Sequence, residues 1–325
     1  MCKKNAHVEE NMKMKRVIAA VVFLVLAVGL YVGIPRVLTG NHVLVRFTNS
    51  ISLDARIYET RRLPEENYDY LAVGSSMTMN NLNSDVLLNY LGPLGEKFYN
   101  FSVWGVTVED IENWTEVLLE KYKPKGIIMF SSMEDFDGEE KDYDYKDISR
   151  YIRGYPESMF YLHYGVFGDL HYYDEYAELQ GYKNDYDSLD FDANGGVALE
   201  VYGIERSMNR WEKQFAEEYQ QDGPSYESLY QIAAKLKQKG IDFYFVQVPS
   251  RPNYMAAEGA KEVLEQHMER CRDIVESSGQ YYYSAVDYEQ YSDQYFSDYT
   301  HMDVHGATML TQEFLENVFI PSREQ

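Results

Sequence analysis

The sequence is poor in cysteine and in basic residues. Its two cysteines, Cys2 and Cys271, lie on opposite sides of the one long apolar segment, so they would be separated by a membrane and no disulfide framework is expected. Lys and Arg number 30 against 53 Asp and Glu. Such an acidic surface repels phosphate backbones, so nucleic acid is not expected as a partner. An anionic polymer would need a local basic site.

The distribution of charge is uneven along the chain. Six of the basic residues and only two of the acidic ones precede residue 37, which leaves a net charge of −27 on the remainder against −23 for the whole chain. Hydrophobic residues make up 45% of the 325-residue sequence and aromatic residues 15%. That much apolar surface offsets the entropy of ordering the chain, so wholesale disorder is excluded. One α/β domain with an insertion, together with an anchor, accounts for the length.

The anchor is the uncharged segment 17–34, which is 18 residues long. A helix of this length is at the lower limit for crossing a hydrocarbon core of roughly 30 Å. Lys13, Lys15 and Arg16 stand just before it, and the positive-inside rule then places the N-terminus in the cytoplasm. Two alternatives remain: a signal peptide cleaved near Ala27 and Gly29, and a buried core helix.

This interpretation predicts a single-pass protein of the cell membrane, with the lipid bilayer as one partner and the main domain outside the cell. The expected divisions are a cytoplasmic segment 1–16, a transmembrane segment 17–34, a connector 35–66 and a catalytic domain 67–325.

Beyond the connector, short apolar runs alternate with amphipathic segments, a pattern typical of a parallel sheet with helices on both faces. The expected strands are 68–73, 97–103, 126–130, 241–248 and 281–286, and the expected helices are 85–91, 108–122, 226–239, 261–278 and 307–319. The fold class is therefore α/β, a three-layer flavodoxin-like sheet. The stretch 134–205 breaks the pattern, and we interpret it as an insertion that caps the carboxyl edge of the sheet, where open α/β sheets bind ligands.

Two segments carry residues suited to acyl chemistry. Ser76 ends a Gly-Ser-Ser run directly after the first strand, where a tight turn would expose its hydroxyl. Asp298 precedes His301 by three residues at a loop-to-helix junction, a spacing that allows the carboxylate to orient the imidazole. Each segment alone is compatible with a simpler role, as a helix cap or a solvated loop. Together they predict a Ser-His-Asp triad.

At these residues the sequence resembles the SGNH, or GDSL-like, hydrolase superfamily, over about residues 66–320. The family's nucleophile turn is matched at Ser76, and its Asp-x-x-His motif at Asp298 and His301. Its second motif, which offers a glycine amide to the oxyanion, is matched by Asn-Phe-Ser-Val-Trp-Gly ending at Gly105. The resemblance implies that Ser76 attacks, His301 acts as base and acid, Asp298 orients His301, and the amides of Ser76 and Gly105 stabilise the oxyanion.

The sequence departs from the family at its third motif, which normally brings an Asn side chain into the oxyanion hole. Residues 131–135 read Ser-Ser-Met-Glu-Asp instead. Ser132 is the expected substitute donor, whereas an inward-pointing Glu134 would oppose an oxyanion. Loss of one donor lowers rates by about 100- to 1000-fold, so this departure bears directly on catalytic efficiency.

The anchored layout is similar to the branch of the superfamily that modifies cell-envelope polymers, including D-alanyl transfer proteins and polysaccharide O-acetyltransferases. The resemblance implies an extracytoplasmic serine acyl-esterase or O-acyltransferase, with a polysaccharide or teichoic-acid-like substrate and a multi-pass membrane O-acyltransferase as partner. The alternative is a non-catalytic subunit that binds the polymer or an acyl carrier for such a membrane enzyme.

Other motifs favour simpler interpretations. The run Asp190-x-Asp192-x-Asn194-Gly195 has the spacing of half a calcium loop, but Val201 stands where the closing Glu is needed. His301, Asp303 and His305, at spacings of two and four residues, are placed for a metal only on a strand. We therefore expect neither a metal nor a cofactor. An aromatic floor for sugar rings is a further possibility in the insertion, although simple packing is favoured for its tyrosines: Tyr143, Tyr145, Tyr172, Tyr173 and Tyr176.

Overall fold

A five-stranded parallel sheet forms the centre of the computed structural model, which describes residues 2–38, 44–64, 67–138, 141–164, 170–200, 208–213, 215, 223–285 and 290–324. The strand order is β2-β1-β3-β4-β5, and every neighbouring pair is parallel. This is the 2-1-3-4-5 order of flavodoxin-like folds, in which the chain reverses direction across the sheet at β1 and β3. The strands are β1 (Tyr70–Ala72), β2 (Phe98–Asn100), β3 (Gly126–Ser131), β4 (Asp242–Gln247) and β5 (Tyr281–Ser284).

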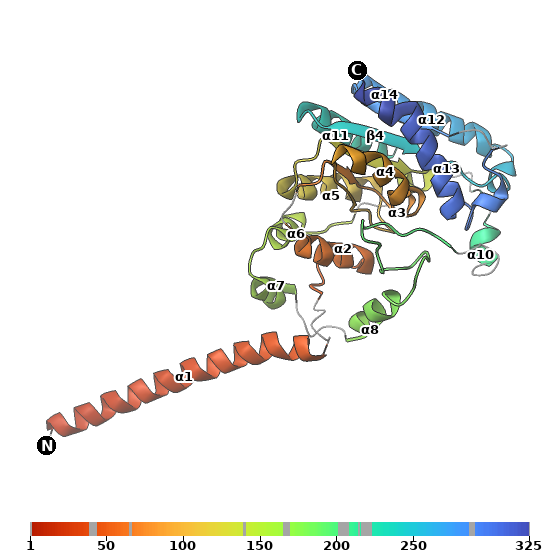
Figure 1. Ribbon diagram of the computed structural model, residues 1–325. Coiled ribbons are helices and arrows are strands. Elements are labelled where there is room, and N and C mark those ends of the chain that lie inside the picture. The colour runs from red at the N-terminus through yellow and green to blue at the C-terminus, as the bar shows by residue number, and fades with distance from the viewer. Residues whose placement is uncertain are drawn as a thin grey trace.

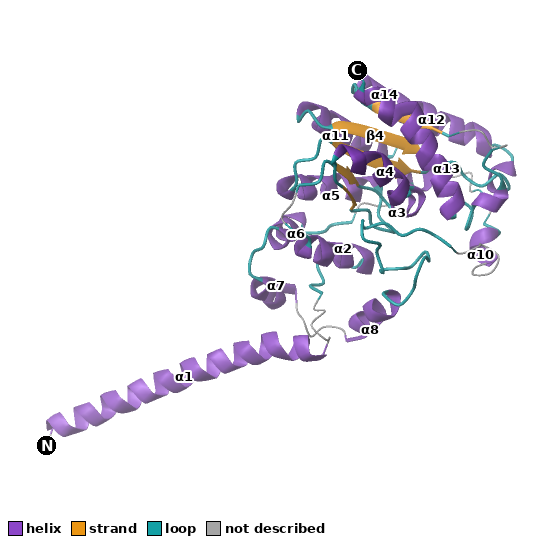
Figure 2. Ribbon diagram, viewed as in Figure 1, coloured by secondary structure: helices purple, strands orange, loops and turns teal. Residues whose placement is uncertain are grey.

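Helices cover both faces of the sheet, as Figure 2 shows. The described helices are α1 (Cys2–Leu38), α2 (Ile51–Arg62), α3 (Ser76–Asn81), α4 (Ser84–Leu91), α5 (Val108–Lys121), α6 (Tyr145–Ile152), α7 (Glu157–Tyr164), α8 (Leu170–Leu179), α10 (Met208–Trp211), α11 (Pro224–Gln238), α12 (Ala260–Ser277), α13 (Val304–Phe314) and α14 (Ile320–Arg323). One face packs against α5, α11 and α12, and the other against α4 and α13.

The strands are apolar on both faces because both faces are covered. Ile127 and Met129 of β3 point into the core shared with α5 and α11, whereas Ile128 and Phe130 point into the core shared with α13. Successive side chains of a strand face opposite ways, so a strand buried on both sides reads as a continuous apolar run. The predicted parallel α/β sheet is thereby confirmed. The predicted strand 281–286 ends at Ser284, and Val286 lies outside the described residues.

The stretch expected to be a connector contains a buried helix. Helix α2 starts after Ser50, whose side chain caps it by accepting from the Leu53 amide, and it ends at Arg62. Apolar Leu53 and Ile57 join the core beside α5 and α6. Polar side chains of α2 are buried as well, among them Asp54, Arg56 and Thr60.

The expected insertion 134–205 contributes α6, α7 and α8 and an irregular segment up to residue 200; 139–140, 165–169 and 201–205 lie outside the described residues. Figure 1 shows α2, α6, α7 and α8 grouped between the sheet and α1. Tyr172 and Tyr176 of α8 pack against α2, and the Tyr145 hydroxyl donates to Asp110 of α5. These helices therefore pack on the connector helix and on α5, while the segment that follows α8 reaches the functional site described below.

Helix α1 projects from the rest of the molecule (Figure 1). Its segment Met12–Tyr31 spans 20 residues and is apolar and long enough to cross a membrane. None of this segment is buried inside the rest of the chain, and its last residue, Tyr31, packs partly against the core and donates to the Tyr161 carbonyl. A long apolar segment exposed in this way is unlike a core helix, which packs its apolar face against the domain.

Candidate active site

Ser76 is placed by the turn that joins β1 to α3. Strand β1 ends at Ala72, and Ser76 is the first residue of α3. Ser75 caps this helix, with its hydroxyl accepting from the Met77 amide at 3.0 Å. The Gly74 carbonyl accepts from the Val103 amide at 2.9 Å, which joins the turn to the loop after β2. The Ser76 side chain therefore stands at the carboxyl end of β1, where the strand order reverses and ligands bind in such sheets.

Asp298 and His301 occupy a tight loop before α13. The Ser297 amide donates to the His301 carbonyl at 2.8 Å. Asp298 Oδ1 accepts from the amides of Thr300 at 2.9 Å and His301 at 2.7 Å. Asp303 then caps α13 by accepting from the amides of His305 and Gly306 at 3.0 and 2.8 Å. Sequence neighbours thus fix the carboxylate of Asp298 and direct its second oxygen toward the imidazole.

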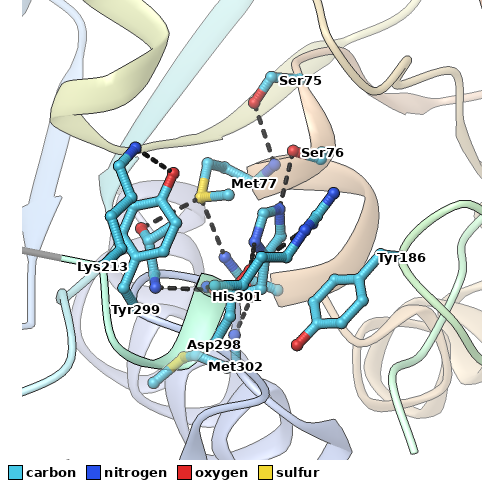
Figure 3. A network of polar contacts seen from close by, with 12 residues as sticks. Ser75, Ser76, Met77, Tyr186, Lys213, Asp298, Tyr299, His301 and Met302 are labelled. Carbon is cyan, nitrogen blue, oxygen red and sulfur yellow. Dashed lines mark hydrogen bonds and ion pairs between the residues drawn. The ribbon is translucent and has the colours of Figure 1, made fainter. Parts of the chain in front are cut away.

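The three predicted residues meet in space, as Figure 3 shows. His301 Nε2 lies 2.9 Å from Ser76 Oγ, and His301 Nδ1 lies 2.9 Å from Asp298 Oδ2. Asp298 is fully buried, His301 is 8% exposed, and Ser76 is partly exposed. Burial raises the pKa of Asp298, but the charge of His301 and the hydrogen bonds from His301 and Thr300 outweigh it, so the pKa is lowered overall. The carboxylate is therefore ionised at neutral pH.

A cavity of about 460 Å³ opens over Ser76 and His301. Its walls are aromatic and charged, and its lining residues are Ser76, Trp104, Gly105, Tyr186, Asp187, Arg210, Lys213, Tyr299 and His301. Arg210 lies over the Tyr186 ring at 4.7 Å, and Lys213 lies over the Tyr299 ring at 4.2 Å. Arg210 also approaches Asp298 Oδ2 at 3.8 Å and Asp187 at 3.9 Å. In a strongly acidic chain, this cavity brings two cations beside the candidate nucleophile.

The sequence did not point to six of these lining residues: Trp104, Tyr186, Asp187, Arg210, Lys213 and Tyr299. Trp104 and Tyr299 stand next to predicted site residues, Gly105 and Asp298, which was their only signal. The others come from the insertion and from the segment after it, which have no strand or helix periodicity to place them on the sheet edge. For Arg210 and Lys213, the sequence offered only the general expectation that an anionic polymer would need a local basic site.

The two predicted oxyanion residues outside the nucleophile turn are placed differently. Gly105 lines the cavity together with Ser76, and its φ of +73° is the left-handed conformation that favours glycine. Ser132 is fully buried and is not among the residues that line the cavity. Its hydroxyl has no hydrogen-bond partner. Gly105 therefore borders the cavity that holds Ser76, whereas Ser132 is not among the residues that line it.

A buried carboxylate, Asp135, stands in the loop that follows β3. Its Oδ2 accepts from the Ser131 hydroxyl at 2.8 Å and from the Ser132 amide at 3.3 Å. Burial raises the pKa of Asp135 to about 6, although hydrogen bonds from Ser75, Ser131 and Ser132 act in the opposite direction. Because Ser75 precedes the nucleophile and caps its helix, Asp135 links the loop after β3 to the nucleophile turn.

The half calcium loop is an ordinary acidic turn. Asp192 Oδ1 accepts from the amides of Asn194 at 2.7 Å and Gly196 at 3.0 Å. Gly195 has a φ of +81°, and a Cβ there would meet the Asn100 carbonyl oxygen at 2.2 Å. His305 is exposed. Among the residues that the structure describes, no group of three His, Cys, Asp or Glu side chains is arranged to hold a metal.

The tyrosines proposed as an aromatic floor lie away from the cavity. Tyr172 donates to the buried Asp54 of α2, and Tyr173 donates to the Leu44 carbonyl at 2.8 Å. Tyr143 donates to Asn49. They pack the insertion against the segment that follows α1. The aromatic walls of the cavity come instead from Trp104, Tyr186 and Tyr299.

Comparisons with known proteins find only a distant similarity, to solved structures. No protein-family model matches the sequence. No curated protein matches it either. Among solved structures, it is similar to one titled "Crystal Structure of TesA", with 12% sequence identity and a TM-score of 0.38, over 76% of this chain and 96% of that chain.

Proposed function

We propose that the chain is a membrane-anchored serine acyl-esterase or O-acyltransferase that acts outside the cytoplasm on cell-envelope glycopolymers. The observation that carries the proposal is the chain of two hydrogen bonds from Ser76 through His301 to Asp298, each 2.9 Å long. A serine hydroxyl is a weak nucleophile until a neighbouring base takes its proton, and the base needs a carboxylate to hold its tautomer. The resemblance of the same three residues to the SGNH motifs supports the same interpretation.

In the first step, Ser76 Oγ attacks the ester carbonyl carbon while its proton passes to His301 Nε2. The carbonyl oxygen becomes an oxyanion, and the amides of Ser76 and Gly105 donate hydrogen bonds to it. Asp298 stabilises the imidazolium that forms. When the tetrahedral intermediate collapses, the bond to the alcohol breaks, and the alcohol leaves with the proton from His301. Ser76 then carries the acyl group as an ester.

In the second step, water or a sugar hydroxyl attacks the acyl-enzyme. His301 takes the proton of the attacking hydroxyl. When the second tetrahedral intermediate collapses, the bond between the acyl carbon and Ser76 Oγ breaks, and His301 gives the proton to Ser76 Oγ. Water gives hydrolysis, and a sugar hydroxyl gives transfer. The cavity over Ser76 has three aromatic walls, which suit the apolar faces of sugar rings.

Features outside the triad support the membrane location and the substrate that we propose. Helix α1 is long enough to hold the domain at a membrane. Arg210 and Lys213 supply the basic groups that an acidic chain needs at a site for an anionic polymer such as teichoic acid. A multi-pass membrane O-acyltransferase that supplies acyl groups is the proposed partner.

Covalent labelling tests the proposal. The full chain, purified in detergent, is incubated with a fluorophosphonate probe and separately with p-nitrophenyl acetate. The Ser76→Ala variant is expected to lose labelling and to lose turnover by at least about 1000-fold. Ser277→Ala, at the exposed end of α12, is the control and should match wild type. Equal labelling of wild type and Ser76→Ala would refute the proposal. Adding a polysaccharide acceptor then separates transfer from hydrolysis by the appearance of acylated sugar.

A second candidate is a non-catalytic subunit that holds the polymer or an acyl carrier for the membrane enzyme. The observation that favours it is the loop after β3, where no asparagine is present and the Ser132 hydroxyl does not line the cavity. Complementation of a deletion strain decides between the two. A Ser76→Ala protein that restores polymer acylation supports the binding role, and failure at wild-type abundance supports the enzyme.

A further inference from the structure

Arg56, in the middle of α2, is fully buried. Its Nε donates to the Ser102 carbonyl at 3.0 Å, and its Nη2 donates to the Gly195 carbonyl at 2.7 Å. Its guanidinium lies over the Phe191 ring at 3.7 Å, and Nη1 pairs with Glu59 one turn further along the helix. One side chain thereby joins the helix after the anchor to two loops of the main domain.

The first of these loops, residues 101–105, is the one that carries Gly105 to the site. Further bonds hold it as well. Among them, the Ser102 amide donates to Asn100 Oδ1 at 3.0 Å, the Val103 amide donates to the Gly74 carbonyl at 2.9 Å, and the Trp104 amide donates to Ser52 Oγ at 3.1 Å. Ser52, like Arg56, belongs to α2. The helix therefore holds the loop at two points, one and three residues before Gly105.

We infer that α2 is a positioning element of the active site, with Arg56 and Ser52 fixing the loop that aims the Gly105 amide at the oxyanion. This inference rests on the proposed function. An oxyanion donor is effective only within a narrow range of position, because it must meet a charge that develops in the transition state. The loop's own Gly105 is in a left-handed conformation and has no side chain to anchor it. Its carbonyl accepts from Lys141 Nζ at 2.7 Å, and α2 anchors the residues one and three positions before it.

An arginine is suited to this role because its planar guanidinium carries five N–H groups in a fixed fork. Arg56 uses three of its nitrogens toward three separate acceptors. A lysine at this position would have one nitrogen, and its flexible stem would not hold both loops in one geometry. The consequence is that the stretch expected from sequence to be a simple connector belongs to the catalytic machinery.

Paired variants of the full chain test the inference. Arg56→Met removes the donors and keeps an apolar side chain of similar reach. It is expected to lower kcat for p-nitrophenyl acetate by about 100-fold, the lower end for loss of an oxyanion donor. KM should change less than about threefold, because the lost contact acts in the transition state. Arg62→Met is the matched control: its guanidinium also lies 3.7 Å over a ring, that of Tyr58, but it is exposed on the far end of α2.

Ser52→Ala keeps the test decisive if Arg56→Met does not fold. It removes one hydroxyl, and kcat is expected to fall about tenfold while the melting temperature changes little. Guanidinium ion at millimolar concentration should partly restore kcat in Arg56→Ala and not in Ser52→Ala. The inference is overturned if Ser52→Ala keeps wild-type kcat and Arg56→Met either keeps wild-type kcat or does not fold. That result would leave the proposed function standing. Absence of any Ser76-dependent turnover in wild type would overturn the proposed function, and this inference with it.

Discussion

Asp298 has two oxygens in different surroundings, and this asymmetry determines what a substitution does. Oδ1 accepts two backbone amides, and Oδ2 faces His301 Nδ1. In Asp298→Asn the amide oxygen takes the Oδ1 position, since only an oxygen can accept there, and the NH2 group then donates to Nδ1. That tautomer leaves the proton on Nε2, which can no longer accept from Ser76. We expect kcat for p-nitrophenyl acetate to fall by about 10³- to 10⁴-fold.

The same carboxylate affects stability at low pH. The pKa of Asp298 is lowered in the folded chain, and the unfolded value is about 3.9. Its ionised form therefore stabilises the fold above pH 4, and this contribution disappears as the pH falls through the folded pKa. Urea unfolding at pH 6 and pH 3 should show a smaller loss of stability for Asp298→Asn than for wild type. Equal losses would contradict the lowered pKa, and turnover within tenfold of wild type would contradict the proposed role of Asp298.

Asp135 is expected to show the opposite pH dependence. Burial raises its pKa to about 6, so between pH 4 and pH 6 the folded chain holds a proton that the unfolded chain has released. The free energy of unfolding then falls as the pH rises through this window, by roughly 2 to 3 kcal/mol from this group. Asp135→Asn cannot ionise and should remove that part of the slope between pH 4.5 and pH 7.5. Parallel stability profiles for variant and wild type would exclude the raised pKa.

At the scale of elements, the nucleophile turn depends on a close contact between β1, α3 and β3. A Cβ at Gly74 would meet Thr78 Oγ1 at 1.9 Å. Thr78 Oγ1 in turn donates to the Phe130 carbonyl at 2.7 Å and accepts from the Phe130 amide at 3.0 Å. The backbone at the turn and the side chain that joins α3 to β3 therefore occupy adjacent space. Glycine is the residue that fits.

Gly74→Ala should accordingly displace α3 and Ser76 with it. We expect a loss of stability of about 1 to 3 kcal/mol, as for other overpacked cores, and a fall in kcat of more than about tenfold from misplacement of the nucleophile. Gly92→Ala is the control, because Gly92 has ordinary helical angles and no heavy atom within 4 Å of an added Cβ. Thermal unfolding and esterase assays of both variants check the prediction. Equal behaviour of the two would show that the turn tolerates a side chain.

The same scale separates what the sequence could predict from what it could not. The strand 126–130 and the helix 108–122 were predictable because an apolar run and a 3.6-residue period reflect burial by neighbours on known faces. Helix α2 was not, since its buried face includes Arg56 and Asp54, whose burial depends on partners more than 40 residues away. Hydrophobic periodicity does not record a buried polar side chain that is satisfied by distant acceptors.

The residues of the candidate site also divide into those that the sequence could predict and those that it could not. Ser76, Asp298 and His301 were predictable because local turns place each of them, and the parallel sheet brings their loops to one region of its edge. Ser132 was predicted as an oxyanion donor from its position in the loop after β3, yet it is fully buried and is not among the residues that line the cavity. The direction of a side chain in an irregular loop depends on packing, which spacing alone does not determine.

For the whole molecule, the basic residues that precede the apolar helix predict how the chain is oriented in a membrane. The sequence holds two cysteines, one at each side of the apolar helix. Cys271 is fully buried in α12, and burial raises its pKa well above the ordinary value, so its thiol is protonated and shielded from reagents. Cys2 precedes the basic residues that are expected to stay in the cytoplasm. The accessibility of the Cys2 thiol therefore reports on which side of the membrane the N-terminus lies.

A membrane-impermeant maleimide applied to intact cells should leave the wild-type chain unlabelled, and after permeabilisation it should add one label, at Cys2. Ser277→Cys places a thiol on the exposed end of α12 and should be labelled in intact cells. Cys2→Ser should abolish the label seen after permeabilisation, which verifies that Cys271 stays inaccessible. Labelling of Cys2 in intact cells, with Ser277→Cys protected, would place the catalytic domain in the cytoplasm and refute an extracytoplasmic substrate, while the contacts among Ser76, His301 and Asp298 would be unaffected.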